Sequence, residues 1–202
     1  MADERWLIAG LGNPGPRYAG NRHNAGYLVA DLLAARMGVR FKRDSSGAAV
    51  AVGWLAGLPV TLGKPLSYMN LSGRPVAALR SFYKIPAQRV LVVHDELDIP
   101  FGVIRLKLGG GDNGHNGLRS VTAALATRDY YRARLGIGRP AGRMDPADFV
   151  LRDFSAAERK QLPGLIDRCA DAVQTLLARG LAAAQNEFHQ DISPGDLSRF
   201  PR

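Results

Sequence analysis

His23 is the residue of this sequence whose type and setting best suit acid–base chemistry. It lies in a polar loop between Arg22 and Asn24, just before an apolar pattern typical of a helix. An imidazole titrates near neutral pH, so a histidine in such a loop can take a proton from water as a general base. A surface or helix-capping histidine is the alternative, and the neighbouring groups decide between them.

An acid that can orient His23 is available in Asp95, which lies at the C-terminal end of a buried strand predicted over 90–93. A carboxylate bound to one ring nitrogen leaves the other nitrogen to face water. His94 is adjacent, and neighbours on a strand point to opposite faces, so both should not line one site. We favour Asp95 as the site residue, with a helix cap or loop carboxylate as its alternative.

Three asparagines, Asn13, Asn70 and Asn116, lie in three different polar loops. A side-chain amide both donates and accepts hydrogen bonds, which suits a peptide backbone or a ribose. Each asparagine taken alone is more typical of a local turn.

Positive charge is concentrated in the first part of the chain. The net charge is +9, and residues 1–143 hold 20 basic and 9 acidic residues. A basic body favours a polyanionic partner, with nucleic acid first. Membrane binding would require a basic amphipathic helix or a lipidation signal, and the sequence shows neither. Lys107 and Arg134, on predicted strands near the loop 109–117, are candidate phosphate contacts; a solvated basic face is the alternative.

Several other chemistries lack their sequence signals. Gly10, Gly12 and Gly15 form a GxGxxG pattern, but Pro14 lies inside it and no helix opens there, which argues against dinucleotide binding. The four histidines lack zinc-site spacing and there is no CxxC, so we predict no metal and no cofactor. No GxSxG motif supports a serine nucleophile. The single cysteine, Cys169, recurs with apolar residues at helical spacing and is expected in the core.

The elements that must position these residues alternate between strands and helices. Strands are predicted over 6–11, 48–55, 58–62, 90–93, 103–108 and 131–137. Helices are predicted over 25–37, 118–126 and 181–188, with one capped by Ser72 that runs to 84. Ser155 and Glu158 form a capping box for a further helix that Pro163 interrupts or restarts before residue 179. This alternation predicts an α/β fold around a mostly parallel or mixed sheet.

The chain is long enough for one domain, predicted over 1–190, followed by a loose tail over 191–202. The start of the chain is acidic and no apolar run approaches a membrane span, so we expect a cytoplasmic protein.

Five segments, taken together and in order, resemble the bacterial peptidyl-tRNA hydrolase family. The matching stretches are GLGNPG…Y…RHNAG (10–26), KPLSYMNLSG (64–73), VVHDELDIPFG (92–102), KLGGGDNGHNG (107–117) and RLGIGRP (134–140). The resemblance spans about 5–190, and the combination is specific although each motif alone is weak. It implies a single three-layer α/β/α globule with a mixed, mostly parallel central sheet, acting as a metal-independent monomer.

The resemblance also implies the reaction, which is hydrolysis of the ester between a peptide and the 3′ end of tRNA. His23 would activate the attacking water, Asp95 would fix its basic form, and Asn13 would help distinguish blocked from free aminoacyl-tRNA. The resemblance implies that Asn70 and Asn116 would hold the peptide and the attacking water or the carbonyl, with Met69 packing beside them. Tyr18 and Tyr68 would line the terminal nucleotide or peptide channel. Lys107 and Arg134 would clamp tRNA phosphate.

The sequence departs from the family pattern in the glycine-rich loop, where Asp112 and Asn113 replace smaller residues or a histidine. An acidic residue there is expected to weaken RNA binding or alter loop opening. Tyr68 stands where the family usually has phenylalanine, and the match weakens after about residue 143. Two rival functions are an RNA-binding relative without catalysis, which the retained site residues oppose, and a small-ester hydrolase, which leaves the basic body unexplained.

Overall fold

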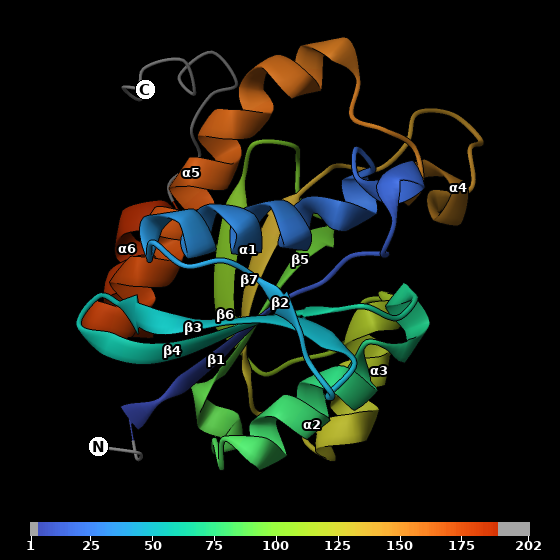
Figure 1. Ribbon diagram of the computed structural model, residues 1–202. Coiled ribbons are helices and arrows are strands. Elements are labelled where there is room, and N and C mark those ends of the chain that lie inside the picture. Colours follow the sequence, from blue (N-terminus) through green and yellow to red (C-terminus); the bar gives the residue numbers. More distant parts are fainter. Residues whose placement is uncertain (1–3, 190–202) are drawn as a thin grey trace.

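A computed structural model describes residues 4–189, and its framework is a seven-stranded mixed sheet (Figure 1). The strand order is β2-β3-β4-β1-β5-β7-β6. The four central strands are mutually parallel: β4 (Leu58–Pro65), β1 (Trp6–Gly10), β5 (Val90–Glu96) and β7 (Tyr131–Gly136). The outer strands pair antiparallel with their neighbours: β2 (Lys42–Arg43), β3 (Ala48–Leu55) and β6 (Ile104–Leu108). The predicted mixed sheet is confirmed, with its parallel part confined to the centre.

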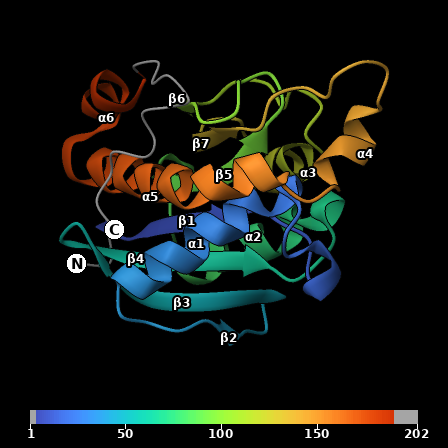
Figure 2. The same cartoon turned by 90° about the horizontal axis from the view of Figure 1, so that it is seen from above.

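Helices cover both faces of the sheet, which gives the predicted three layers (Figure 1), and Figure 2 looks down on one of the helix-covered faces. One face carries α1 (Ala25–Arg36) and α5 (Ala156–Arg179), and the other carries α2 (Gly73–Phe82) and α3 (Asn116–Leu125). The short helix α4 (Pro146–Val150) precedes α5, and α6 (Leu181–Phe188) packs beside the edge strand β6. Single 3-10 turns cover Pro16–Tyr18, Arg22–Asn24, Met69–Leu71 and Ala87–Arg89.

The core is split by the sheet into two apolar clusters. In β1, Leu7 and Ala9 belong to the cluster with α2 and α3, whereas Ile8 belongs to the cluster with α1 and α5. Side chains alternate along a strand, so a continuous apolar run is what a strand covered on both faces requires. This explains why the central strands read as unbroken apolar stretches.

Two glycines let the start of α1 lie directly against the central strands. A Cβ on Gly26 would lie 2.3 Å from the carbonyl oxygen of Val93, and one on Gly10 would lie 2.3 Å from that of Gly26. Only glycine permits such an approach of one backbone to another. Gly10, which begins the GxGxxG pattern, therefore serves helix–sheet packing, and the close approach brings the loop before α1 to the end of β5.

Two local predictions were wrong. Helix α5 runs through Pro163 without a break, because its buried stripe packs on the sheet and outweighs the loss of one backbone hydrogen bond. Ser72 does not cap α2 through its side chain. Its hydroxyl instead donates to the carbonyl oxygen of Met69 at 2.8 Å, because a 3-10 turn precedes the helix and already holds Ser72 in helical geometry.

The tail predicted over 191–202 lies outside the described residues. Within residues 4–189, no helix is long and apolar enough to cross a membrane.

Candidate active site

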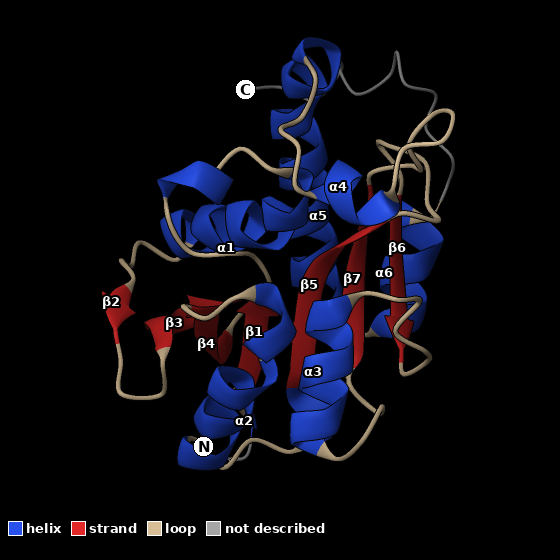
Figure 3. Cartoon of the chain, turned by 90° about the vertical axis from the view of Figure 1, so that its right-hand side faces the viewer, coloured by secondary structure: helices blue, strands red, loops and turns tan. Residues whose placement is uncertain are grey.

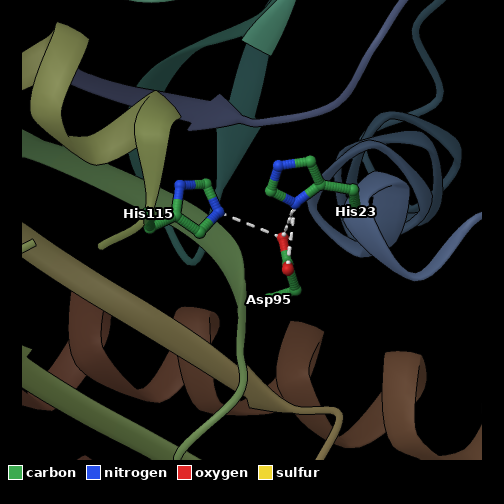
Figure 4. Close-up of side chains that lie close together, drawn as sticks. All are labelled: His23, Asp95 and His115. Carbon is green, nitrogen blue, oxygen red and sulfur yellow. Dashed lines mark hydrogen bonds and ion pairs between the residues drawn. The ribbon is translucent and has the colours of Figure 1, made fainter. Parts of the chain in front are cut away.

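His23 and Asp95 are hydrogen-bonded partners, brought together from elements 72 residues apart in the chain (Figure 4). His23 lies in the 3-10 turn just before α1, and Asp95 lies near the carboxyl end of β5. Nδ1 of His23 lies 2.9 Å and 3.0 Å from the two carboxylate oxygens of Asp95. Because the Asp95 carboxylate accepts a hydrogen bond from the protonated Nδ1 of His23, Nε2 of the neutral ring carries no proton and is the basic nitrogen.

A second histidine, His115, shares the same carboxylate, and sequence reasoning missed it. Its Nε2 lies 3.1 Å from Oδ1 of Asp95. His115 caps α3: its Nδ1 accepts the backbone amides of Gly117 at 3.1 Å and Leu118 at 3.3 Å. A ring nitrogen that accepts carries no proton, so Nε2 holds the proton and donates it to Asp95. The only sequence signal was its position beside Asn116 at the start of a predicted helix.

The charge of Asp95 dominates the electrostatics of this cluster. Burial opposes a charged His23, but the adjacent carboxylate and its hydrogen bond outweigh burial and raise the pKa of His23 above 6.5. Burial also opposes a charged Asp95, yet the two histidines hold the pKa of that carboxyl far below its usual range. Asp95 therefore stays ionised at neutral pH and stabilises the imidazolium that forms when His23 takes a proton.

His94 is excluded from this site, as the alternation along the strand predicts. Its side chain is fully buried, and its Nδ1 lies 2.6 Å from the carbonyl oxygen of Asp95. Burial, followed by repulsion from His115, lowers the pKa of His94 well below 6.5. It lines neither of the two cavities beside His23.

The same three residues are the group whose geometry could hold a metal ion among residues 4–189. One donor atom from each of His23, Asp95 and His115 lies within 4.8 Å of the others. Two histidines and a carboxylate form a common metal-binding set. Here, however, both histidine nitrogens that face Asp95 are committed to hydrogen bonds, and the other nitrogen of His115 caps α3. The absence of a metal requirement stays a prediction.

Asn13 is tied to the loop that carries His23. The side chain of Asn24 bonds the backbone of Asn13 twice, accepting from its amide and donating to its carbonyl, both at 2.9 Å. Oδ1 of Asn13 in turn accepts the backbone amide of Met69 at 2.7 Å. The connection between β1 and α1 and the distant turn at Met69 thus share one hydrogen-bond network beside the imidazole.

Arg22 fixes the same loop to the segment 149–158. Its guanidinium donates to Glu158 at 2.6 Å and to the carbonyl of Asp153 at 2.8 Å, and it stacks over Phe149 at 4.2 Å. The Arg22 side chain is only 7% exposed and that of Glu158 18% exposed. Arg22 is therefore a buried anchor for the backbone that positions the adjacent His23.

Substitution Arg22→Met is expected to lower the free energy of unfolding by roughly 3 kcal/mol, because it leaves a largely buried carboxylate without its cation. It is also expected to lower kcat, since the His23 loop loses its anchor. Urea unfolding and peptide-release kinetics measure the two effects. The matched control is Arg36→Met, whose ion pairs to α5 involve half-exposed aspartates; that change should cost about 1 kcal/mol or less. Equal losses in the two variants would contradict this role of Arg22.

Two cavities are bordered by His23. The first, of about 270 Å³, adjoins Asp95, Glu96, His115 and the glycine-rich loop. The second, of about 320 Å³, is lined by the predicted residues Asn13, Tyr68, Met69 and Asn70. Both are bordered by His23, Asn116 and α4. This arrangement suits a substrate whose reacting bond lies at the imidazole and whose two parts occupy different cavities.

Most of the predicted binding residues meet at the second cavity. Asn70 and Tyr68 are exposed there, and Met69 is buried beside them. Tyr18 contacts Tyr68 edge-on, with ring centroids 6.4 Å apart, but does not line the cavity itself. Tyr18 therefore lies next to the second cavity and contacts Tyr68, which lines it.

Lys107 and Arg134 line neither cavity and lie on the edge strand β6 and on its neighbour β7. Burial lowers the pKa of both side chains, and Arg132 adds to this by repulsion. Arg132, which lies on β7 with Arg134, is fully buried and donates to the carbonyls of Gly110 and Gly111. Arg132 therefore supports the glycine-rich loop from beneath, while Lys107 and Arg134 remain the candidate phosphate contacts.

Asp112 and Asn113 make contacts within the glycine-rich loop and at its base. Asn113 donates to Glu96 at 3.2 Å, and Asp112 accepts the amide of Gly114 at 2.9 Å. Asp112 also lies 3.9 Å from the guanidinium of Arg119. These contacts tie the loop to the end of β5, so the departure from the family pattern bears on loop opening.

Comparisons with known proteins agree with this geometry. A family model described as peptidyl-tRNA hydrolase matches residues 7–195. A peptidyl-tRNA hydrolase of Frankia casuarinae is 66% identical over 93% of this chain and 95% of its own, and one of Streptomyces coelicolor is 60% identical over 91% and 94%. The crystal structure of peptidyl-tRNA hydrolase from Acinetobacter baumannii superposes with a TM-score of 0.87 at 38% identity, covering 96% of this chain and 98% of that one. The chain therefore belongs to the peptidyl-tRNA hydrolase family.

Proposed function

We propose that this chain cleaves the ester between a peptide and the 3′ end of tRNA, with His23 as general base. The observation that carries the proposal is the position of His23, which is bound through Nδ1 to Asp95 and borders both cavities. Water attacks the ester carbonyl carbon while Nε2 of His23 takes its proton. The tetrahedral intermediate then collapses, and the proton passes from His23 to the leaving 3′ oxygen of the tRNA.

In this proposal the asparagines supply polar contacts to the peptide. Asn70 and Asn116 face the second cavity, where side-chain amides can bind the peptide backbone and stabilise the developing oxyanion. Asn13, Met69 and Tyr68 also line this cavity, and Tyr18 packs against Tyr68 from outside it. Contacts of this kind read the backbone and the ester, so many peptide sequences can be accepted.

The substrate assay that tests the proposal measures peptide release from an N-blocked aminoacyl-tRNA, with free aminoacyl-tRNA as the comparison. Fast release from the blocked substrate alone is the expected result. Tight tRNA binding without release would contradict the enzyme proposal and favour the RNA-binding rival. Release whose KM does not rise with salt would favour a small-ester hydrolase, since RNA binding weakens steeply with salt.

The phosphate contacts predict a separate result for Lys107→Gln combined with Arg134→Gln. Losing two phosphate contacts should raise KM about tenfold, the equivalent of about 1.4 kcal/mol of binding. The slope of log KM against the logarithm of the salt concentration should fall by about one to two, and kcat should change little. The control is Lys42→Gln combined with Arg43→Gln on β2, two exposed cations at the opposite edge of the sheet. An equal rise of KM in the control would show a general charge effect and no clamp.

We further propose that residues 1–190 act as one domain and that the protein works as a monomer in the cytoplasm. The clusters on both faces of the sheet include residues from β1 through α6, which supports one folding unit. Peptidyl-tRNA arises where translation occurs, which supports the location. Analytical ultracentrifugation of the purified chain measures its mass in solution and tests the monomeric state.

A further inference from the structure

Helices α2 and α3 lie side by side (Figure 3), and a groove lined by residues of both borders the second cavity. Its volume is about 690 Å³, and it shares Asn70 and Asn116 with the second cavity. Beyond these, it is lined by Leu71 and Arg74 from one side and by Arg119, Ser120, Ala123 and Ala124 of α3. We call it the α2–α3 groove, and its continuity with the site means that a substrate held at His23 can extend into it.

Helices α2 and α3 pack closely together beside the groove, where Gly73 meets Ser120. A Cβ on Gly73 would lie 2.0 Å from the backbone oxygen of Ser120, and the Gly73 amide donates to the Ser120 hydroxyl at 2.9 Å. Because only glycine fits there, α2 and α3 are fixed against each other at this point. The groove is therefore a preformed surface, with small alanine side chains along one wall.

The two ends of the site suit different parts of the substrate. Asn113 and Gly114 of the glycine-rich loop line the first cavity, and Nζ of Lys107 lies against Gly110 of the same loop. Under the proposed function, the phosphate contact at Lys107 is therefore on the side of the first cavity. The tRNA then extends from the ester past the first cavity. The peptide, on the other side of the ester, extends through the second cavity into the α2–α3 groove.

The groove carries positive charge. Arg74 and Arg119 are both exposed, and within residues 4–189 no aspartate or glutamate lines the groove. Arg119 is 63% exposed and only loosely held, 3.5 Å from Oδ1 of Asn116 and 3.9 Å from Asp112. Two cations beside small apolar side chains attract a peptide whose side chains carry carboxylates and repel one that carries lysines.

We propose that the α2–α3 groove binds the part of the peptide several residues from the ester, and that Arg74 and Arg119 make the enzyme prefer peptides with aspartate or glutamate there. The inference rests on the proposed function, because it takes the direction of the peptide from the placement of the ester at His23. It adds a specificity site to a reaction whose other contacts read only the backbone.

The test compares three substrates on one tRNA: an N-acetylated aminoacyl-tRNA, and two hexapeptidyl-tRNAs that share the residues next to the ester. The distal half of one hexapeptide carries aspartates and that of the other carries lysines. An extended hexapeptide spans about 20 Å, enough to leave the second cavity, whereas the acetylated amino acid does not. In the wild type, kcat/KM at low salt should favour the acidic over the basic hexapeptide by about fivefold.

The double variant Arg74→Gln, Arg119→Gln should abolish this preference and leave kcat/KM for the acetylated substrate unchanged. The control, Lys42→Gln with Arg43→Gln, removes equal charge outside the groove and should keep the preference. If the groove variant loses activity equally on all three substrates and its salt dependence falls, the arginines bind tRNA and the inference is wrong. A wild type without any preference also overturns it.

A binding measurement separates this inference from the proposed function. Fluorescence anisotropy of the free, labelled acidic hexapeptide should show binding to the wild type that is weakened in the groove variant and absent for the basic hexapeptide. A wild type that releases no peptide from any substrate would contradict the proposed function alone. Equal anisotropy for both peptides, whatever the activity, would overturn the groove assignment.

Discussion

Replacing His23 by alanine is expected to lower kcat for peptide release by about 10² to 10⁴-fold, the usual contribution of a positioned general base. The physical reason is that Nε2 is the basic nitrogen at the junction of the two cavities, while Nδ1 is held by Asp95. KM should change little, because the proposed tRNA and peptide contacts lie elsewhere. Single-turnover release of an N-acetylated amino acid from tRNA measures the effect on the chemical step.

The fold should survive this change. Asp95 keeps its hydrogen bond from His115 when His23 is removed, so the buried carboxylate is not left without a partner. A thermal melt and a tRNA-binding isotherm check the structure and the substrate surface of the variant. His23→Gln, which retains a polar side chain beside Asp95 but no titratable group, should be as slow as the alanine variant. Full activity in either folded variant would overturn the catalytic assignment.

Replacing Asp95 by asparagine is expected to lower kcat by roughly 10² to 10⁴-fold, although Asp95 touches no reacting atom. The carboxylate accepts from Nδ1 of His23 and so keeps Nε2 unprotonated. An asparagine can instead donate to Nδ1, which favours the tautomer that carries its proton on Nε2 and cannot accept one from water. The variant also loses the negative charge that stabilises the imidazolium. Asp95 is thus a positioning residue for the base.

A matched acid-to-amide change tests whether this loss is specific. Asp98 follows the same strand and pairs with Arg139 at 2.7 Å on the surface, outside both cavities. Asp98→Asn should therefore keep kcat within about twofold, since exposed ion pairs contribute little. If Asp95→Asn were as active as Asp98→Asn, the hydrogen bond to His23 would have no part in the reaction.

The sequence predicted the pairing of His23 with Asp95 because both follow rules that act locally. A loop before a helix and the carboxyl end of a central parallel strand meet at one edge of an α/β sheet. The alternation along β5 also separated His94 from Asp95 correctly, since His94 is buried away from both cavities. The loops of Asn13 and Asn70 follow the parallel strands β1 and β4 and lie at the same edge for the same reason. Asn116 does not follow this rule, because its loop leaves the antiparallel strand β6 at the opposite edge, beside the start of β7.

Other features depend on contacts that local rules do not reveal. His115 reaches Asp95 because it caps α3, and a capping histidine has no distinctive spacing in the sequence. Arg22 binds Glu158 across 136 residues, so its burial could not be read from its polar neighbours. Arg132 and Arg134 lie two residues apart on one strand, yet Arg132 is fully buried under the glycine-rich loop. Helix α5 also depends on tertiary contacts, since its packing outweighs the local effect of Pro163 and keeps the helix continuous.

The pH dependence of kcat/KM, measured for the wild type and for Asp95→Asn, tests the role of His23 most directly. The acid limb reports the ionisation of the free enzyme's base. Because Asp95 raises the pKa of His23, wild-type activity should be lost as the pH falls through a value above 6.5. Without that carboxylate, burial alone lowers the pKa, so the acid limb of the variant should move to lower pH. An acid limb at the same pH in both proteins, or none in the wild type, would contradict a base formed by His23 and Asp95.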